Sequence, residues 1–318
     1  MSETNNRHWR PVFIGGCPRS GTTLLADLLA KHSNIEAIPE AQFKFDPALQ
    51  NNHNLSTPDV SFGHVSLDIW GLEVPVEKGS LAQVFCRTVE AFLLNDTVQN
   101  CRWIVDHTPE NLKHAALLAE EFPGARFIHL VRDGRGVAAS LIPLDWGASD
   151  IISAATTWTA GVGFGLAAES YLDGVKIRRV RFEDLVRKPE AVLQKLCEWL
   201  DVRFEPAMIE GGGYAIPSFN KTNHALVGST PDPSRATSWT SKLSKREIEL
   251  FEMRTGDLLV HMGYEKISSG EASPTFAELA GLKAKSYVRQ HVWDRIRFAR
   301  RFRNIVNRKT ADDRADLE

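Results

Sequence analysis

Several features that define other classes of protein are missing from this 318-residue chain. Its cysteines are few and far apart, with no C-x-x-C pair and no Cys/His ligand spacing, which argues against a disulfide framework and a structural zinc site. We expect reduced, mostly buried thiols at Cys17, Cys86, Cys101 and Cys197. No apolar run approaches the ~20 residues of a membrane span, and the polar N-terminus has no signal-peptide apolar region. A cytoplasmic location is therefore expected.

Acidic and basic residues are unevenly distributed, although the formal net charge is only −2. Residues 283–309 contain ten Lys or Arg against a single acid, Asp294, which gives this segment +9 and leaves −11 on the rest. Apolar residues recur there at helical intervals, which predicts a basic amphipathic helix and tail over 283–318, apart from a main domain over 1–282. The helix either packs on the body with a solvated basic face or contacts an anionic membrane surface or acidic substrate. A basic run alone is weak evidence for nucleic-acid binding, so no nucleic-acid partner is predicted.

Short apolar runs typical of strands alternate with helical patterns along the chain. The expected strands cover residues 12–14, 103–105, 126–131 and 176–182. The expected helices cover residues 22–32, 111–121, 135–141, 154–172 and 189–200. This order predicts an α/β fold of three layers, with helices on both faces of a central parallel sheet. Two long irregular stretches, 40–75 and 205–239, are expected to wall a ligand site at the carboxyl ends of the strands.

The stretch "VFIGGCPRSGTTLL", residues 12–25, has the glycine spacing of a Walker A loop but lacks its lysine. Thr22 and Thr23 stand where an NTPase has Lys followed by Ser or Thr. The backbone amides of Ser20 to Thr23 lie at the start of the expected helix, where amides and the helix dipole favour an anion. Arg19 adds a forked positive charge suited to phosphate. The loop therefore predicts a phosphate site without the NTPase lysine.

A second phosphate-binding pattern follows in "FIHLVRDGRGVAAS". An expected strand ends at Arg132, and Ser140 lies eight residues later on the helix that follows, so the two side chains can grip one phosphate. The alternative is an ordinary salt-bridged Arg-Asp-x-Arg turn. Together the two patterns indicate a ligand with two separate phosphate groups.

These motifs resemble those of sulfotransferases that use 3′-phosphoadenosine 5′-phosphosulfate (PAPS). "PRSGTTLL" is similar to their 5′-phosphosulfate loop, "VRDGRGVAAS" to their 3′-phosphate element, and "RVRFEDLVRKPEAVLQKLCEWL" to the segment that follows. The resemblance covers residues 11–40, 101–142 and 176–201 and implies a P-loop-type fold, PAPS as sulfuryl donor, PAP (3′,5′-adenosine bisphosphate) as product and no metal. The cofactor-binding residues it implies are Arg19, Ser20, Gly21, Thr22, Thr23, Arg132 and Ser140.

The resemblance also suggests catalytic residues. Glu40 follows Arg19 by 21 residues, the spacing of the catalytic glutamate in the tyrosylprotein branch, so Glu40 is the expected general base. The alternative for Glu40 is a solvated loop carboxylate. Arg19 is expected to stabilise the sulfuryl group and the bridging oxygen.

His107 departs from that branch, which has a lysine at the corresponding distance before Arg132. Cytosolic sulfotransferases have their catalytic histidine in a similar H-x-P context. His107 is therefore expected to be catalytic, either as a cationic stabiliser or as the base itself, because an imidazole can serve both roles near neutral pH. A third interpretation is that His107 supports the helix that starts near Asn111.

Two further positions concern the 3′-phosphate. Phe182 stands where many relatives have a tyrosine whose hydroxyl helps to bind this group. Arg235, four residues before Trp239 as a cofactor-contacting arginine is in the cytosolic branch, is the candidate that replaces it.

The function predicted from these features is PAPS-dependent transfer of a sulfuryl group to a hydroxyl of a carbohydrate, glycolipid or metabolite. Peptide tyrosine is the alternative acceptor, since the motif spacing is closest to the tyrosylprotein branch. Two other classes are a P-loop nucleotide-dependent kinase, for which Asp106 imitates a Walker B aspartate, and a noncatalytic nucleotide-binding module. The sequence gives no oligomeric state.

Overall fold

The computed structural model describes residues 8–45, 80–93, 101–144, 146–214, 228–268 and 273–288. The chain divides into two units, Met1–Val137 with Trp158–Trp239, and Ala138–Thr157 with Thr240–Glu318. Every predicted site residue except Ser140 belongs to the first unit. Most of the expected wall over 40–75, and residues 215–227 of the second expected wall, lie outside the described residues.

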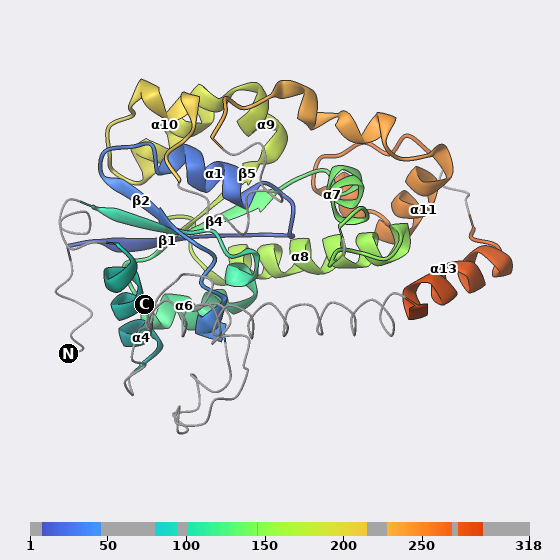
Figure 1. Cartoon of the computed structure of the whole chain (residues 1–318), viewed down its shortest axis with the longest axis horizontal. Helices are drawn as coiled ribbons and strands as arrows, with labels where there is room; N and C mark the ends of the chain where they lie inside the picture. Colours follow the sequence, from blue (N-terminus) through green and yellow to red (C-terminus); the bar gives the residue numbers. More distant parts are fainter. Residues whose placement is uncertain are drawn as a thin grey trace, which may run out of the picture. The chain divides into compact units, whose positions relative to one another are not determined.

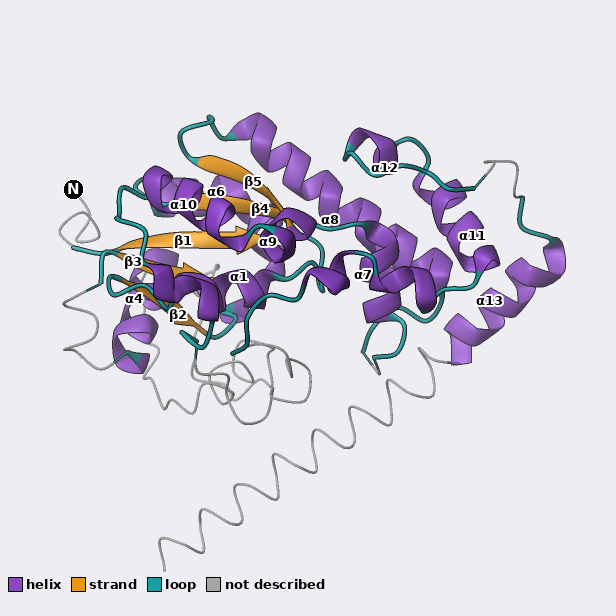
Figure 2. Cartoon of the chain, turned by 90° about the horizontal axis from the view of Figure 1, so that it is seen from above, coloured by secondary structure: helices purple, strands orange, loops and turns teal. Residues whose placement is uncertain are grey.

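The first unit contains a five-stranded parallel sheet. Its strands are β1 (Arg10–Gly15), β2 (Ile35–Ile38), β3 (Trp103–Asp106), β4 (Arg126–Val131) and β5 (Ile177–Arg181). They lie side by side in the order β2-β3-β1-β4-β5 (Figure 2), and each neighbouring pair is parallel. This confirms the predicted α/β fold. The edge strand β2 was not predicted, because its four residues include half-buried Glu36 and do not form an apolar run.

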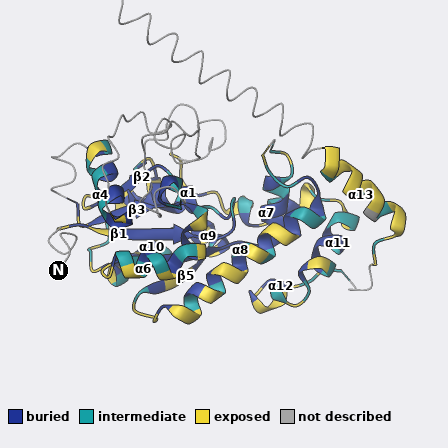
Figure 3. Cartoon of the chain, turned by 90° about the horizontal axis from the view of Figure 1, so that it is seen from below, coloured by how far each residue is buried: buried dark blue, intermediate teal, exposed yellow. Residues whose placement is uncertain are grey.

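Alternate residues of each strand point into two separate cores. On one face Val12, Ile14 and their equivalents pack against α1 (Thr22–Leu29) and α10 (Pro189–Trp199). On the other face Phe13, Phe127 and their equivalents pack against α4 (Leu81–Phe92) and α6 (Ala115–Glu121). Figure 1 shows α1 and α10 above the sheet with α4 and α6 below it, and Figure 3 shows the central strand β1 in the colour of buried residues. The three layers thus match the prediction.

Helix α8 (Ile151–Tyr171) corrects one expectation from the sequence. With 21 residues and high mean hydropathy, it is long and apolar enough to cross a membrane. Its part in the first unit instead packs closely within the protein at two glycines. A Cβ at Gly161 would lie 2.8 Å from Cys17, and one at Gly165 would lie 2.0 Å from His129 Nε2. The glycines allow one face of this half of α8 to approach the glycine loop and β4, and Trp158, Val162 and Ala168 are buried, while Phe164 and Tyr171 are exposed.

The carboxyl ends of the strands bring together residues that are far apart in the sequence. β1 leads into the glycine loop, β2 into Glu40, β3 into His107 and β4 into Arg132. β5 leads directly into α9 (Phe182–Arg187), so Phe182 begins a helix rather than ending the strand as predicted. The predicted helix over 111–121 begins as a 3-10 turn, η3 (Pro109–His114), before α6. In a parallel sheet this edge is where ligands bind.

The side chain of Asp27, on α1, hydrogen-bonds the backbone of a loop that follows η4 (Pro206–Glu210). Its fully buried carboxylate accepts hydrogen bonds from the backbone N–H groups of Gly212, Tyr214 and Gly228, at 2.9 to 3.1 Å. Gly211 and Gly212 have φ of 70° and 79°, a conformation that favours glycine. One carboxylate thus fixes backbone from both sides of segment 215–227.

Replacing Asp27 with alanine is expected to lower the free energy of unfolding by about 1–3 kcal/mol, because the buried N–H of Tyr214 and the part-buried N–H groups of Gly212 and Gly228 lose their acceptor. Urea denaturation measures this change. Asp257, whose side chain is fully exposed, is the control. Its replacement with alanine should change stability by less than about 1 kcal/mol. Equal stability of the two variants would contradict the role given to Asp27.

The second unit is helical in its described part. It contains α11 (Lys245–Thr255), α12 (Leu258–His261) and α13 (Phe276–Val288). Arg246 Nε of α11 donates to Glu278 Oε1 of α13 at 2.8 Å. The helix predicted from residue 283 is the last part of α13 and then lies outside the described residues. The boundary at 282/283 and the membrane contact therefore stay predictions.

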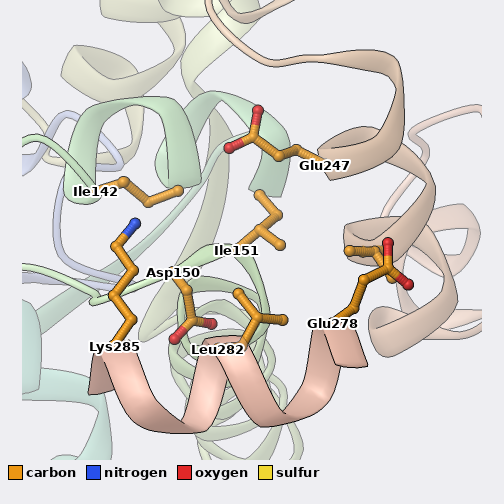
Figure 4. A pocket seen from close by; sticks show the side chains of 9 residues that line it. Ile142, Asp150, Ile151, Glu247, Glu278, Leu282 and Lys285 are labelled. Carbon is orange, nitrogen blue, oxygen red and sulfur yellow. The ribbon is translucent and has the colours of Figure 1, made fainter. Parts of the chain in front are cut away.

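A cavity of about 340 Å³ lies next to α13 in this unit, and Figure 4 shows Glu278, Leu282 and Lys285 pointing into it from one face of the helix. Its lining residues are Ile142, Asp150, Ile151, Glu247, Leu250, Glu278, Gly281, Leu282 and Lys285. None of the predicted site residues is among them, so this cavity is separate from the predicted site.

Candidate active site

The glycine loop between β1 and α1 has an unusual backbone. Gly16 and Gly21 have φ of 150° and 105°, and Arg19 has φ of 70°, which is rare for a residue with a side chain. A Cβ at Gly16 would lie 2.3 Å from the carbonyl oxygen of Leu130 on β4, so only glycine fits there. Strain of this kind concentrates at ligand sites.

The start of α1 offers hydrogen-bond donors to an anion. Gly21 caps the helix without a side-chain hydrogen bond, so no side chain of the cap satisfies the first amides. Ser20 is 1% exposed, and its hydroxyl has no hydrogen-bond partner among the described residues. Thr22 and Thr23 are also buried at the first two positions of α1. These donors suit an anion, and their contact with a 5′-phosphosulfate stays a prediction.

Three arginines from three elements lie together beside this loop. Arg132, at the end of β4, donates to the carbonyl oxygens of Arg19 at 3.0 Å and of Arg235 at 3.4 Å. Burial lowers the pKa of Arg132 to about 10; the carboxylates of Glu183 and Asp133 oppose this shift, and the positive charges of Arg235 and Arg19 add to it. Such a cluster of like charges favours an anionic ligand with more than one acidic group. The structure therefore brings Arg235 to the other predicted cofactor residues.

Phe182 contacts this cluster. The Arg132 guanidinium lies 4.1 Å from the centroid of the Phe182 ring, a cation–π contact. The same ring lies against Gly21, where a Cβ would come within 2.6 Å of it. Phe182 thus contacts both Arg132 and the glycine loop and fixes their relative position.

The alternative for the second motif, an Arg-Asp-x-Arg salt bridge, involves Arg135. The Asp133 carboxylate accepts from Arg135 at 2.7 and 3.0 Å, and the Arg135 guanidinium stacks on Trp239 at 4.1 Å. The salt bridge of that turn is therefore present between Asp133 and Arg135, while the Arg132 guanidinium donates to Arg19 and Arg235. Ser140 lies on α7 (Gly134–Leu141), partly exposed and in the second unit, and its contact with the 3′-phosphate stays a prediction.

Glu40 follows β2 and lies within reach of the second catalytic candidate. Its Oε1 lies 3.9 Å from His107 Nδ1, and its Oε2 accepts from Gln42 Nε2 at 3.0 Å. Crowding by protein atoms, together with the negative charges of Glu110 and Asp106, raises the pKa of Glu40 to about 8. Its side chain is still 29% exposed, so a substrate can reach it. A carboxylate with this pKa suits a general base at neutral to alkaline pH.

His107 is buried at the end of β3. Neither ring nitrogen has a hydrogen-bond partner among the described residues, and the ring meets Tyr214 edge to face with centroids 5.3 Å apart. Burial lowers the pKa of His107 to about 4, so the imidazole is neutral at pH 7. A neutral ring favours hydrogen bonding or proton acceptance over the role of a cationic stabiliser.

Four residues around Glu40 and His107 were not among the predicted site residues. Lys44 and Thr108 hydrogen-bond the Asp106 carboxylate, and all three side chains are fully buried. Tyr214 reaches His107 from a loop that the sequence did not match to any pattern. A lysine flanked by phenylalanines in "AQFKFD" was the one available sign of a buried charge.

The described residues also bear on cysteine chemistry and on metals. Cys17, Cys86, Cys101 and Cys197 are all buried free thiols, as predicted. No group of three or more His, Cys, Asp or Glu in the described part of the chain could hold a metal ion.

Comparison with sequence models of known families identifies the family of this chain. The sequence model of the sulfotransferase family matches residues 11–206, more than half of the chain. The chain belongs to the sulfotransferase family. The matched range of this sulfotransferase includes the glycine loop, Glu40, His107, Arg132 and Ser140, whereas Arg235 lies beyond it.

Curated relatives of this sulfotransferase are similar over part of their length. It is 23% identical over 207 residues to protein-tyrosine sulfotransferase A of Caenorhabditis elegans, covering 62% of this chain and 51% of the relative. It is 28% identical over 211 residues to the Drosophila melanogaster protein-tyrosine sulfotransferase, covering 64% and 40%. The chain thus spans only 40–51% of these two relatives.

A solved structure has the same fold. The sulfotransferase domain of the Synechococcus PCC 7002 olefin synthase superposes with a TM-score of 0.60 and 23% identity, covering 82% of this chain and 97% of that domain. At this identity the likeness concerns the fold alone.

Proposed function

We propose that this sulfotransferase transfers a sulfuryl group from PAPS to an acceptor hydroxyl and releases PAP. The main support is the cluster of Arg19, Arg132 and Arg235 beside the start of α1. The cluster is suited to a ligand with two separate phosphate groups, and the buried, unpartnered Ser20 hydroxyl among the described residues adds a donor.

In this proposal each residue has a defined task. PAPS supplies the activated sulfuryl group when it is bound. The amides of Thr22 and Thr23 and the Ser20 hydroxyl bind the 5′-phosphosulfate, while Arg132, Arg235 and Ser140 bind the 3′-phosphate. These six groups bind the two phosphate-bearing ends of PAPS, and the reacting atoms are left to the catalytic residues.

The catalytic roles fall to Glu40, Arg19 and His107. Glu40 accepts the proton of the acceptor hydroxyl on a carboxylate oxygen. Arg19 donates hydrogen bonds where negative charge grows on the bridging oxygen. His107, neutral and 3.9 Å from Glu40, is the second candidate for proton acceptance.

A kinase fits less well. A Walker B aspartate needs a free carboxylate for Mg²⁺, but both oxygens of Asp106 accept hydrogen bonds, from Lys44 and from Thr108. A noncatalytic module would not require a carboxylate of raised pKa beside an unpartnered imidazole at the anion site.

The pH profile separates the two candidate bases. Glu40, with a pKa of about 8, must lose its proton to act, so kcat/KM should rise with pH and level off above about pH 8. If His107 were the base, its pKa of about 4 would give a flat profile from pH 5 upward. Steady-state kinetics between pH 5 and 10 measure this, and a flat profile would contradict Glu40 as the base.

The acceptor belongs to one of two classes. A carbohydrate, glycolipid or metabolite hydroxyl is the first, and peptide tyrosine is the second, favoured by the relatives named protein-tyrosine sulfotransferases. We would supply radiolabelled PAPS in EDTA with tyrosine peptides, oligosaccharides and phenolic compounds as separate panels. Labelled product in one panel assigns the class, whereas no transfer to any hydroxyl would contradict the proposed reaction.

A further inference from the structure

A network of buried polar side chains hydrogen-bonds the backbone of Ala41, directly after Glu40. Thr108 Oγ1 accepts the N–H of Ala41 at 2.9 Å, and Lys44 Nζ donates to the carbonyl oxygen of Ala41 at 3.2 Å. Both backbone polar groups of Ala41 are therefore held by side chains. Asp106 holds these two side chains in turn, since its Oδ2 accepts from Lys44 and its Oδ1 accepts from the Thr108 hydroxyl at 2.5 Å.

The buried ion pair of this network adds little net free energy to folding. Lys44 and Asp106 are both fully buried, and the Lys44 ammonium lies 4.4 Å from the Phe45 ring centroid, with Phe13 and Phe85 at 5.8 and 6.0 Å. Removing two such charges from water costs about as much as their attraction returns, and apolar residues at such sites are often equally stable. An aromatic pocket of this kind could hold an apolar side chain. Stability alone therefore does not account for the ion pair.

The network has a clear geometric effect. The 3-10 turn η2 (Gln42–Phe45) carries Lys44, and β3 ends at Asp106, so the network joins the segment after β2 to the end of β3. The same two segments carry Glu40 and His107. The distance of 3.9 Å between Glu40 Oε1 and His107 Nδ1 thus depends on the hydrogen bonds of Ala41 with Thr108 and Lys44.

We propose that Lys44, Asp106 and Thr108 are positioning residues that hold Ala41 and thereby aim the Glu40 carboxylate at the acceptor hydroxyl. None of the three touches substrate in this arrangement; they act through the backbone of Ala41. The inference rests on the proposed function, because it takes Glu40 as the general base. A displacement of about 1 Å at such a group can lower turnover by about 100-fold.

The sharpest test replaces Thr108 with valine, which keeps the shape, changes no charge and removes the acceptor of the Ala41 N–H. The control is Thr88→Val, because Thr88 is an equally buried threonine of α4 whose hydroxyl donates within its own helix, to Val84 O at 2.9 Å. Lys44→Met is a second variant that keeps an apolar chain among the phenylalanines. If it fails to fold, Thr108→Val still decides the question.

Three measurements are made on the full chain: kcat with the best acceptor, the PAP dissociation constant, and amide hydrogen exchange of the peptide over residues 38–45. For Thr108→Val we expect kcat to fall about 10- to 100-fold, PAP binding to stay within twofold of wild type, and exchange at Ala41 to speed up. In a Glu40→Gln background the same substitution should cause no further loss of kcat. Thr88→Val should change none of these.

Two results would overturn the inference: wild-type kcat and exchange in Thr108→Val, or a loss of kcat that multiplies fully with that of Glu40→Gln. A failure of the proposed function looks different. Wild-type protein would then not bind PAP, or Glu40→Gln would keep full activity, while exchange at Ala41 would still report on the network.

Discussion

Glu40→Gln is expected to lower kcat by about 10²- to 10⁴-fold, the usual contribution of a general base. Glutamine keeps the shape of the side chain and can still accept the hydrogen bond from Gln42, but it cannot take a proton. PAP binding should stay at the wild-type level, since Glu40 is not among the groups assigned to the phosphates. Steady-state kinetics and calorimetry on the same preparation measure both quantities.

Glu36→Gln is the matched control for this variant. Glu36 lies four residues earlier, on the edge strand β2, and burial also raises its pKa, so the two substitutions are chemically alike. We expect Glu36→Gln to change kcat by less than about threefold. Full activity in Glu40→Gln combined with loss of activity in His107→Ala would transfer the role of base to His107.

Arg132→Ala is expected to weaken PAP binding by about 1.5–3 kcal/mol, or roughly 10- to 150-fold. The side chain contributes a charge in the anion site, fixes the carbonyl oxygen of Arg19 and stacks on Phe182, and alanine loses all three. Arg132→Lys should recover little of the loss, because an ammonium neither forks nor stacks as a guanidinium does. Isothermal titration with PAP measures the affinities.

Arg102→Ala controls for the loss of one positive charge. Arg102 immediately precedes β3, at the amino ends of the strands, where it contacts Asp201. Its removal should therefore leave PAP binding within about twofold of wild type. Wild-type affinity in Arg132→Ala would remove this residue from the cofactor site.

The sequence predicted the sheet wherever an apolar run coincided with a strand. β1, β3 and β4 were found because their residues are mostly buried and read as nearly continuous apolar stretches, whereas β5 was found although it contains three arginines and two exposed residues. β2 was missed because an edge strand of four residues leaves little apolar signal. The division into two units was also beyond the sequence, because the second unit joins residues 138–157 to the far C-terminal part of the chain.

Some residues of the candidate site could also be predicted from the sequence, and others could not. The motifs of the site's anion-binding half are local, since a glycine loop followed by a helix and an arginine at a strand end can each be read from spacing, although Arg132 then reaches Arg19 across 113 residues. Its catalytic surroundings depend on contacts over long sequence distances. Lys44 reaches Asp106 across 62 residues, and Tyr214 reaches His107 from a distant loop. No period or motif predicts such pairs, nor the burial that mainly raises the pKa of Glu40 and lowers that of His107.

Calorimetric titration of the full chain with PAP, in EDTA and without acceptor, tests the central claim most directly. ATP with Mg²⁺ is titrated in parallel. The account predicts binding of PAP without metal, in preference to ATP, and a weaker isotherm for Arg132→Ala. Preference for ATP with Mg²⁺, or no binding of PAP, would contradict a sulfotransferase site built around Arg19, Arg132 and Arg235.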